Sequence, residues 1–161
     1  MTAAVRALVA LGAICTLVFP AGAASVATPT NFRFTTPVPL EFVQFTPHVA
    51  FFFAEPVETR VPRVGRATVD VDFSTCSPYP CEPTGTASMR ATITASGGTL
   101  VLSGGSNSHD EVSNTGTWTV TEATGRFEGY TGAGTYTWSW SVTPPPFGTA
   151  SLSLVGYLGR E

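Results

Sequence analysis

Two short stretches, residues 66–73 (RATVDVDF) and 87–94 (ASMRATIT), alternate between apolar and polar side chains. Successive side chains of a β-strand point to opposite faces, so this alternation predicts strands with one buried face and one face in water. Between the first two dozen residues and the C-terminus, no helical period persists over three turns. Further strands are expected around residues 100–102, 118–120, 136–142 and 152–154. The sequence therefore predicts an all-β domain.

Residues 24–65 differ in composition from the rest, because they are rich in proline and phenylalanine. Proline lacks the amide hydrogen that a central strand needs, so the prolines are expected to divide this segment into short pieces. Two pieces, residues 31–35 (NFRFT) and 49–54 (VAFFFA), still fit short strands. With them the count reaches about eight, which is enough to close a single antiparallel barrel and remove its exposed edges. We expect the core of the barrel over residues 66–161, with its start within residues 30–65.

Residues 1–23 have the layout of a cleaved signal peptide. Arg6 precedes an apolar run over residues 7–19, Pro20 ends the run, and small residues follow at 21–23. The run is shorter than the ~20 apolar residues that a membrane span needs. We expect cleavage after Ala23, or alternatively after Ala27, and therefore a secreted protein with no membrane span in the mature chain.

Two cysteines, Cys76 and Cys81, remain after residues 1–23 are removed. They flank the turn-forming sequence Ser-Pro-Tyr-Pro in a chain that is expected to reach an oxidising compartment. A local disulfide is therefore predicted, worth about 2 kcal/mol for so short a loop. Free thiols, or half of a metal site, are the alternatives. The second is disfavoured because neither histidine has ligand spacing to the pair.

The charge pattern and the lack of motifs narrow the function classes. The formal net charge is −3, and no stretch of the sequence concentrates the arginines, so a nucleic-acid partner is not expected. There is no Gly-x-Ser-x-Gly elbow, phosphate loop or paired-cysteine zinc pattern. We therefore expect no cofactor and no metal ion.

The most distinctive passage is residues 124–135 (TGRFEGYTGAGT), where four glycines surround single aromatic residues. Such glycines predict corners at which strands bend sharply. Together with residues 116–121 (GTWTVT) and 152–158 (LSLVGYL), the passage resembles the allene oxide cyclase and dirigent-type barrel superfamily. The resemblance covers roughly residues 84–158.

This resemblance implies a calycin-like barrel of eight strands, often assembled as a homo-oligomer. Residues 123–125 are Ala-Thr-Gly where the family commonly has Gly-Thr-Gly, and the first third of the chain does not match. Because the plant cyclases place much of their catalytic pocket on early strands, no catalytic residue is carried over to a position of this chain.

Two groups of charged residues could carry chemistry. Asp70 and Asp72 share one face of a strand, where paired carboxylates could exchange a proton if they lined a dry pocket. The favoured interpretation is a solvated outer face, with the intervening valines inside. The cluster His109, Asp110 and Glu111 lies in a polar stretch, and His48 is the only other histidine, so a solvated loop is expected there.

The interior of the predicted barrel could be packed solid or could hold one small ligand, and a packed core is favoured. Any remaining cavity is expected to be lined by Met89, Phe127, Trp138 and Trp140. We expect a secreted, non-enzymatic barrel that binds a small apolar molecule or a partner protein. The alternative is an isomerase or cyclase, which would need a buried polar group to stabilise charge. The charged residues closest to apolar positions are Glu41, Arg90 and Glu128.

Overall fold

The computed structural model describes residues 31–45, 49–76, 87–106, 113–141 and 148–160. These segments form nine strands and one short 3-10 turn. In chain order they are β1 (Asn31–Phe45), β2 (Val49–Ala54), β3 (Val57–Val61), β4 (Gly65–Cys76), β5 (Ala87–Ala95), β6 (Gly98–Ser106), β7 (Ser113–Ala123), η1 (Gly125–Phe127), β8 (Tyr130–Ser141) and β9 (Gly148–Arg160).

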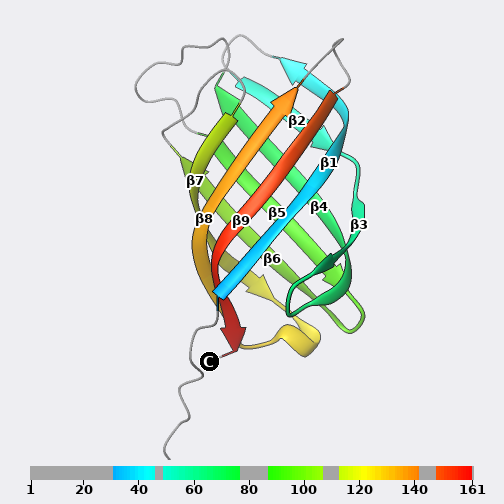
Figure 1. Ribbon diagram of the computed structural model, residues 1–161, viewed down its shortest axis with the longest axis vertical. Helices are drawn as coiled ribbons and strands as arrows, with labels where there is room; N and C mark the ends of the chain where they lie inside the picture. Colours follow the sequence, from blue (N-terminus) through cyan, green and yellow to red (C-terminus); the bar gives the residue numbers. More distant parts are fainter. Residues whose placement is uncertain (1–30, 46–48, 77–86, 107–112, 142–147, 161) are drawn as a thin grey trace, which may run out of the picture.

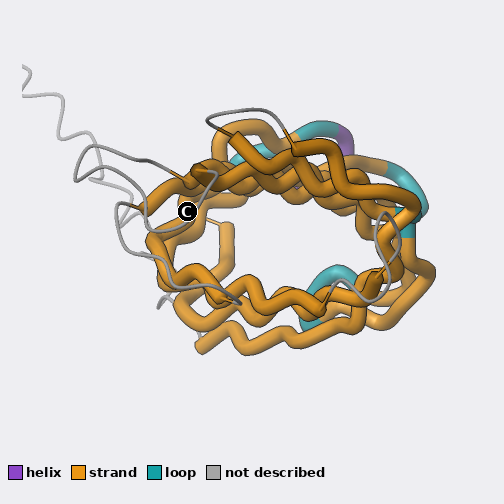
Figure 2. The backbone as a smooth tube through the Cα atoms, turned by 90° about the horizontal axis from the view of Figure 1, so that it is seen from above, coloured by secondary structure: helices purple, strands orange, loops and turns teal. Residues whose placement is uncertain are grey.

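Eight of these strands close into one antiparallel barrel, so the predicted fold class is confirmed. The strand order is β2-β1-β9-β8-β7-β6-β5-β4-β3, and a further pairing of β2 with β4 completes the ring. The strands cross the barrel at a steep tilt (Figure 1) and enclose one interior when seen from above (Figure 2). We call the end where β4 finishes and β9 begins the upper end, as drawn in Figure 1. The end that holds the β3–β4 turn, η1 and the last residue of β9 is the lower end.

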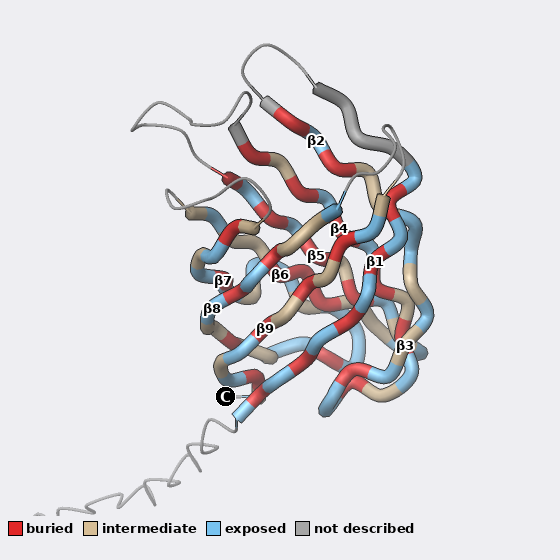
Figure 3. Tube along the Cα trace, turned by 45° about the horizontal axis from the view of Figure 1, so that its top comes forward, coloured by how far each residue is buried: buried red, intermediate tan, exposed pale blue. Residues whose placement is uncertain are grey.

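The alternation in the sequence is the alternation between interior and surface (Figure 3). On β4, Val69, Val71 and Phe73 are at most 3% exposed. Asp70 and Asp72 between them are exposed, so the prediction of a solvated outer face for this pair is confirmed. The inward side chains of the strands merge into one hydrophobic core. Burial of this apolar surface is the main force that stabilises the barrel.

The prolines of the N-terminal segment do not interrupt its first strand, and here the prediction of short pieces was wrong. β1 runs for 15 residues and contains Pro37 and Pro39. The Pro39 carbonyl accepts a 2.9 Å hydrogen bond from the Glu55 N–H, which shows that its backbone faces away from β9. Pro37 has the same orientation, because backbone groups alternate along a strand. The missing amide hydrogens therefore cost the β1–β9 ladder nothing.

The structure also adds β3, which the sequence analysis did not predict. This strand has only five residues, lies between Pro56 and Pro62, and stays outside the ring, where it pairs with the first part of β4. Its outward residues Glu58 and Arg60 are exposed. Charged side chains on so short a strand are typical of edges that resist pairing with other chains.

The glycines of residues 124–135 allow large side chains to meet inside the barrel. Gly134 of β8 and Gly156 of β9 are cross-strand partners, flanked by Trp118 on β7 and Phe32 on β1. The rings of Phe32 and Trp118 meet edge to face with centroids 5.8 Å apart. A Cβ atom on Gly134 would overlap the carbonyl oxygen of Val155. The close approach of β8 and β9 therefore requires glycine here.

The Gly-Arg-Phe turn closes the lower end. Gly125 has φ +59°, a left-handed conformation that favours glycine, and a Cβ there would meet the Gly97 carbonyl. Phe127 is 2% exposed and packs edge to face against Tyr130 at 5.4 Å. Arg126 Nη2 donates a 2.5 Å hydrogen bond to the Val64 carbonyl in the β3–β4 turn. These contacts tie two corners of the barrel together below the core.

Candidate functional site

Aromatic side chains from β2, β4 and β8 fill the upper part of the barrel interior. Phe73 stacks on Trp138, with ring centroids 5.0 Å apart and ring planes 21° apart. Phe52 lies 5.6 Å from Phe73 and 5.1 Å from Trp140. We call Phe52, Phe73, Trp138 and Trp140 the upper aromatic cluster.

The topology explains why these rings meet. Phe52 and Phe73 are cross-strand partners on β2 and β4, so their side chains share the inner face. β8 lies opposite β4, since three strands of the ring separate the two on either side. An eight-stranded barrel is narrow enough for large side chains from opposite walls to touch. Trp138 therefore reaches Phe73 across the interior.

Two buried polar atoms beside this cluster have no hydrogen-bond partner in the described part of the chain. They are Nε1 of Trp138, a residue that is 0% exposed, and Oγ1 of Thr75, which is 5% exposed. Thr75 follows Phe73 by two residues on β4 and so points to the same side of the sheet. By contrast, Nε1 of the buried Trp118 donates to the Thr135 carbonyl at 3.0 Å. An unpaired buried polar group costs about 1–3 kcal/mol, so two at one end of a core need an explanation.

A pocket of about 300 Å³ adjoins the cluster at the upper rim of β8 and β9. Trp140 lines it and is only partly buried, whereas Trp138 below it is fully buried. The other lining residues are Ser139, Ser141, Thr149, Ala150 and Ser151. Trp140 thus lies between the outside of the molecule and the other three rings of the cluster.

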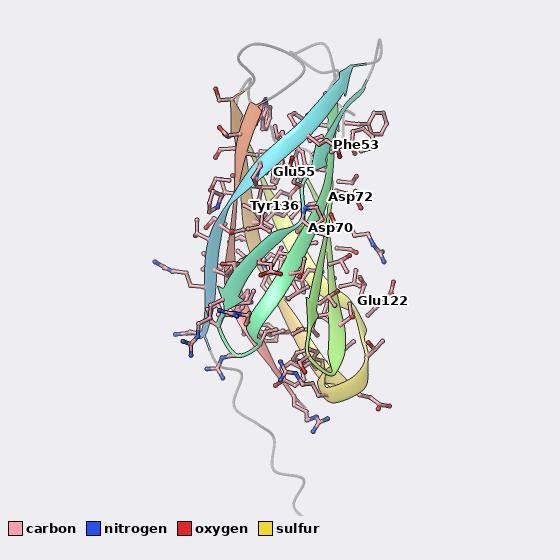
Figure 4. The ribbon with its side chains drawn as sticks, turned by 90° about the vertical axis from the view of Figure 1, so that its right-hand side faces the viewer. Phe53, Glu55, Asp70, Asp72, Glu122 and Tyr136 are labelled. Carbon is pink, nitrogen blue, oxygen red and sulfur yellow. The ribbon has the colours of Figure 1, made fainter. Side chains whose placement is uncertain are left out.

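A second polar pair inside the barrel is fully satisfied. The Tyr136 hydroxyl donates a 2.6 Å hydrogen bond to Oδ1 of the buried Asn114. Burial raises the pKa of Tyr136 to about 12, so the phenol stays protonated at neutral pH. Figure 4 shows Tyr136 within the ring of strands, while Asp70 and Asp72 lie on its outer side. The Tyr136 hydroxyl serves as a fixed neutral donor within the core.

Three of the four predicted cavity residues lie in the upper part of the barrel. Trp138 and Trp140 belong to the cluster, and Met89 is the cross-strand partner of Phe73. Phe127 lies at the lower end, because it precedes the start of β8 at Tyr130. Trp138 is eight positions further along β8 than Tyr130, a span of about 27 Å. The four predicted residues therefore do not form one group.

The sequence analysis missed Phe52, Thr75 and Asn114 as members of the upper interior. The alternation on β4 was visible as far as Phe73, and its extension by two residues would have marked Thr75 as inward-facing. Which side chains meet across the barrel depends on which strands lie opposite each other. That information is not contained in the pattern of any single strand.

The charged residues nearest to apolar positions all lie at the surface. Glu41, Arg90 and Glu128 are exposed, so none of the three places a charge in the interior. Arg90 Nη2 lies 3.0 Å from Glu122 Oε1, with both side chains about half exposed. Such pairs contribute about 0–1 kcal/mol. These residues give no support to a charge-stabilising group inside the barrel.

Several predictions fall outside the described residues. The signal peptide at residues 1–23 and the histidines at 48 and 109 are among them, as are Asp110 and Glu111. Cys76 ends β4, but Cys81 lies beyond the described segments, so the disulfide stays a prediction.

Within the described segments, no three His, Cys, Asp or Glu side chains gather as metal ligands would. Over the same segments there is no helix with the length and hydropathy to cross a membrane. Comparison of the chain with family models, with curated proteins and with solved structures finds no match. The function is therefore inferred from the geometry of the barrel.

Proposed function

We propose that this protein binds one small, largely apolar molecule at the upper end of its barrel, against the upper aromatic cluster. The observation that carries the proposal is the pair of buried, unpartnered polar atoms, Trp138 Nε1 and Thr75 Oγ1. Ligand sites are typically apolar with a few well-placed polar groups that fix orientation. An aromatic wall with one donor and one hydroxyl has that composition.

The chemistry of the two atoms defines the class of ligand. An indole N–H can only donate a hydrogen bond, and a threonine hydroxyl can donate or accept. The ligand therefore carries an oxygen acceptor, such as a carbonyl, on a flat or greasy body that stacks on the rings. The lower end is closed by Phe127 and the Arg126–Val64 hydrogen bond, so the route of entry is the upper rim beside Trp140.

The proposal also includes export of the protein and its membership of the allene oxide cyclase and dirigent-type superfamily. The layout of residues 1–23 and the glycine-rich passage support these two points, and a small eight-stranded barrel agrees with the second. We favour binding over catalysis, because the charged candidates within the described segments, Glu41, Asp70, Asp72, Arg90 and Glu128, are all at the surface.

Thr75→Val offers a direct test with Nile red, a neutral planar dye that carries a carbonyl group. Valine keeps the volume and removes the hydroxyl. We expect the dissociation constant, measured by dye fluorescence, to rise about fivefold to tenfold, the equivalent of one lost hydrogen bond. The free energy of unfolding should stay equal or rise, because an unsatisfied buried hydroxyl is removed.

Thr36→Val is the matched control. Thr36 is also buried, at 1% exposure, but its hydroxyl already donates a 3.1 Å hydrogen bond to the Pro37 carbonyl. This variant should lose about 1 kcal/mol of stability and keep its affinity for the dye. Equal affinities for Thr75→Val and the wild-type protein would refute the assigned site. Native mass spectrometry of protein from its own host would then identify the natural ligand, and a chain that never carries one would count against binding altogether.

A further inference from the structure

Five arginines that are dispersed in the sequence gather at the lower end of the barrel, away from the upper aromatic cluster. Arg60 and Arg66 lie on the β3–β4 hairpin, Arg63 in its turn, Arg126 in η1 and Arg160 at the end of β9 (Figure 1). The carboxylates on these same elements are Glu58 on β3, Glu128, which follows η1, and Asp70 and Asp72 on β4. Asp70 and Asp72 lie further up the barrel, since Asp70 is four residues, about 13 Å, beyond Arg66 along β4. This end is therefore basic on a chain with a formal net charge of −3.

Arg60 and Arg66 are the centre of this basic end. They are direct cross-strand partners, and both are exposed on the outer face of the hairpin. Like charges directly opposite each other destabilise a strand pair. In the segments that the structure describes, the ion pair joins Arg90 to Glu122 instead, further up the barrel at the level of Asp72. Glu58, two residues from Arg60 on the same outer face, is the acidic neighbour and can offset only one of the two charges.

A pocket of about 470 Å³ opens at this pair of arginines. It is lined by Glu58, Thr59, Arg60, Gly65 and Arg66. Glycine at position 65, where φ is +92°, leaves the backbone beside Arg66 uncovered by any side chain. The pocket therefore offers two guanidinium groups and a threonine to one bound group.

The neighbouring arginines are held in place without being neutralised. Arg126 donates to the Val64 carbonyl, and Arg160 Nε donates to the Glu128 carbonyl at 3.0 Å. A neutral carbonyl fixes a guanidinium but leaves its charge available. Arg63 has φ +67° in the hairpin turn, a left-handed conformation that costs a non-glycine residue about 1–2 kcal/mol. The turn thus carries a charged residue where glycine would fit with less strain.

We propose that the β3–β4 hairpin binds a phosphate group of a soluble polyanion, with Arg60 and Arg66 on one phosphate and Arg63, Arg126 and Arg160 extending the contact along the chain. Guanidinium groups match phosphate oxygens with paired hydrogen bonds, which a lysine cannot supply. A soluble polyanion fits better than a bilayer, which would need an apolar face to insert. Among the exposed large apolar residues of the described segments, Phe51 lies on β2, and Val155 and Tyr157 lie on β9 before Arg160, outside the hairpin and η1.

The test is titration of the full-length protein with inorganic polyphosphate by isothermal calorimetry. The double variant Arg60→Gln/Arg66→Gln should bind at least about tenfold more weakly, since tenfold corresponds to 1.4 kcal/mol and two charge-assisted contacts are lost. The slope of log affinity against log salt should become shallower by about 2. Arg60→Lys/Arg66→Lys keeps both charges but loses the paired hydrogen bonds of the guanidinium groups. Its affinity for polyphosphate should therefore lie between those of the wild type and the glutamine double variant.

Arg90→Gln is the control, because it removes one positive charge from the outer face of β5 at the level of Asp72, six residues or about 20 Å up β4 from Arg66. It should leave polyphosphate binding unchanged within about twofold. An equal loss in Arg90→Gln and in Arg60→Gln alone would show a general charge effect and overturn the site. Binding to phosphatidylglycerol vesicles with no binding to polyphosphate would overturn the soluble ligand. The glutamine double variant should keep its thermal stability, because it relieves a repulsion, so lost binding cannot be ascribed to unfolding.

Discussion

Gly134→Ala tests the packing that gives the barrel its interior. The new Cβ would lie 2.7 Å from the Cα of Gly156 and would also overlap the Val155 carbonyl, both backbone atoms that no rotamer change can move aside. β8 and β9 would have to separate at the point where Trp118 and Phe32 pack across them. Overpacking of this kind costs about 1–3 kcal/mol, and we expect a value near the upper limit because both neighbours are backbone. That is a large part of the 5–15 kcal/mol typical of a domain.

The measurement is urea unfolding followed by tryptophan fluorescence, with Gly159→Ala as the matched control. Gly159 lies on the same strand as Gly156, but a Cβ there would meet nothing within 4 Å. That variant should be neutral or gain up to about 1 kcal/mol, because alanine restricts the unfolded chain. If Gly134→Ala lost less than about 0.5 kcal/mol, or no more than Gly159→Ala, the glycine pair would not be what permits the close approach of the strands.

Two further predictions concern single contacts, and a third concerns the predicted export of the protein. Burial raises the pKa of Tyr136 from 10.0 to about 12, so between these pH values the folded protein keeps a proton that the unfolded chain loses. The free energy of unfolding should therefore fall as pH rises from 10 to 12, by at most about 1.4 kcal/mol per pH unit. Urea unfolding at both pH values should show that Tyr136→Phe removes this fall in stability. Arg126→Ala should lower the free energy of unfolding by about 1–2 kcal/mol, because it loses the hydrogen bond to Val64 and the stacking over Phe127. A melting temperature equal to that of the wild type would show that these two contacts do not stabilise the lower end. Mass spectrometry of exported protein without reductant should find Cys76 joined to Cys81 and Ala24 at the N-terminus, and free thiols or an intact leader would contradict the secretory interpretation.

The barrel was predictable because one physical rule governs most of its strands. Inward side chains must be apolar and outward ones need not be, so the alternation around Val69 and Ile93 marked strands with a buried face. A second expectation, that proline interrupts a strand, was wrong for β1, which runs through Pro37 and Pro39. A proline disrupts a strand only where its missing N–H would have faced a partner, and the direction of each backbone N–H follows from the pairing, which the sequence does not display.

The basic end of the barrel could not be predicted from the sequence either, because it also depends on strand pairing. No stretch of the chain concentrates positive charge, and the sequence analysis saw no basic patch. The fold gathers five arginines because a hairpin turn, a 3-10 turn and a strand end all fall at one end of the barrel. Only the cross-strand register shows that Arg60 faces Arg66, since the two are six positions apart in the chain.

The two proposed sites lie at opposite ends and on opposite faces of β4. Arg66 lies at its lower end on the outer face, and Thr75 lies nine residues further on the inner face, about 30 Å away along the strand. Effects of substitutions at such distances add with little coupling, unless a conformational change connects them. Arg60→Gln/Arg66→Gln should therefore leave Nile red affinity unchanged, and Thr75→Val should leave polyphosphate affinity unchanged. A loss of both affinities in either variant would mean that the two ends respond together, and the barrel would then have to be treated as one coupled site.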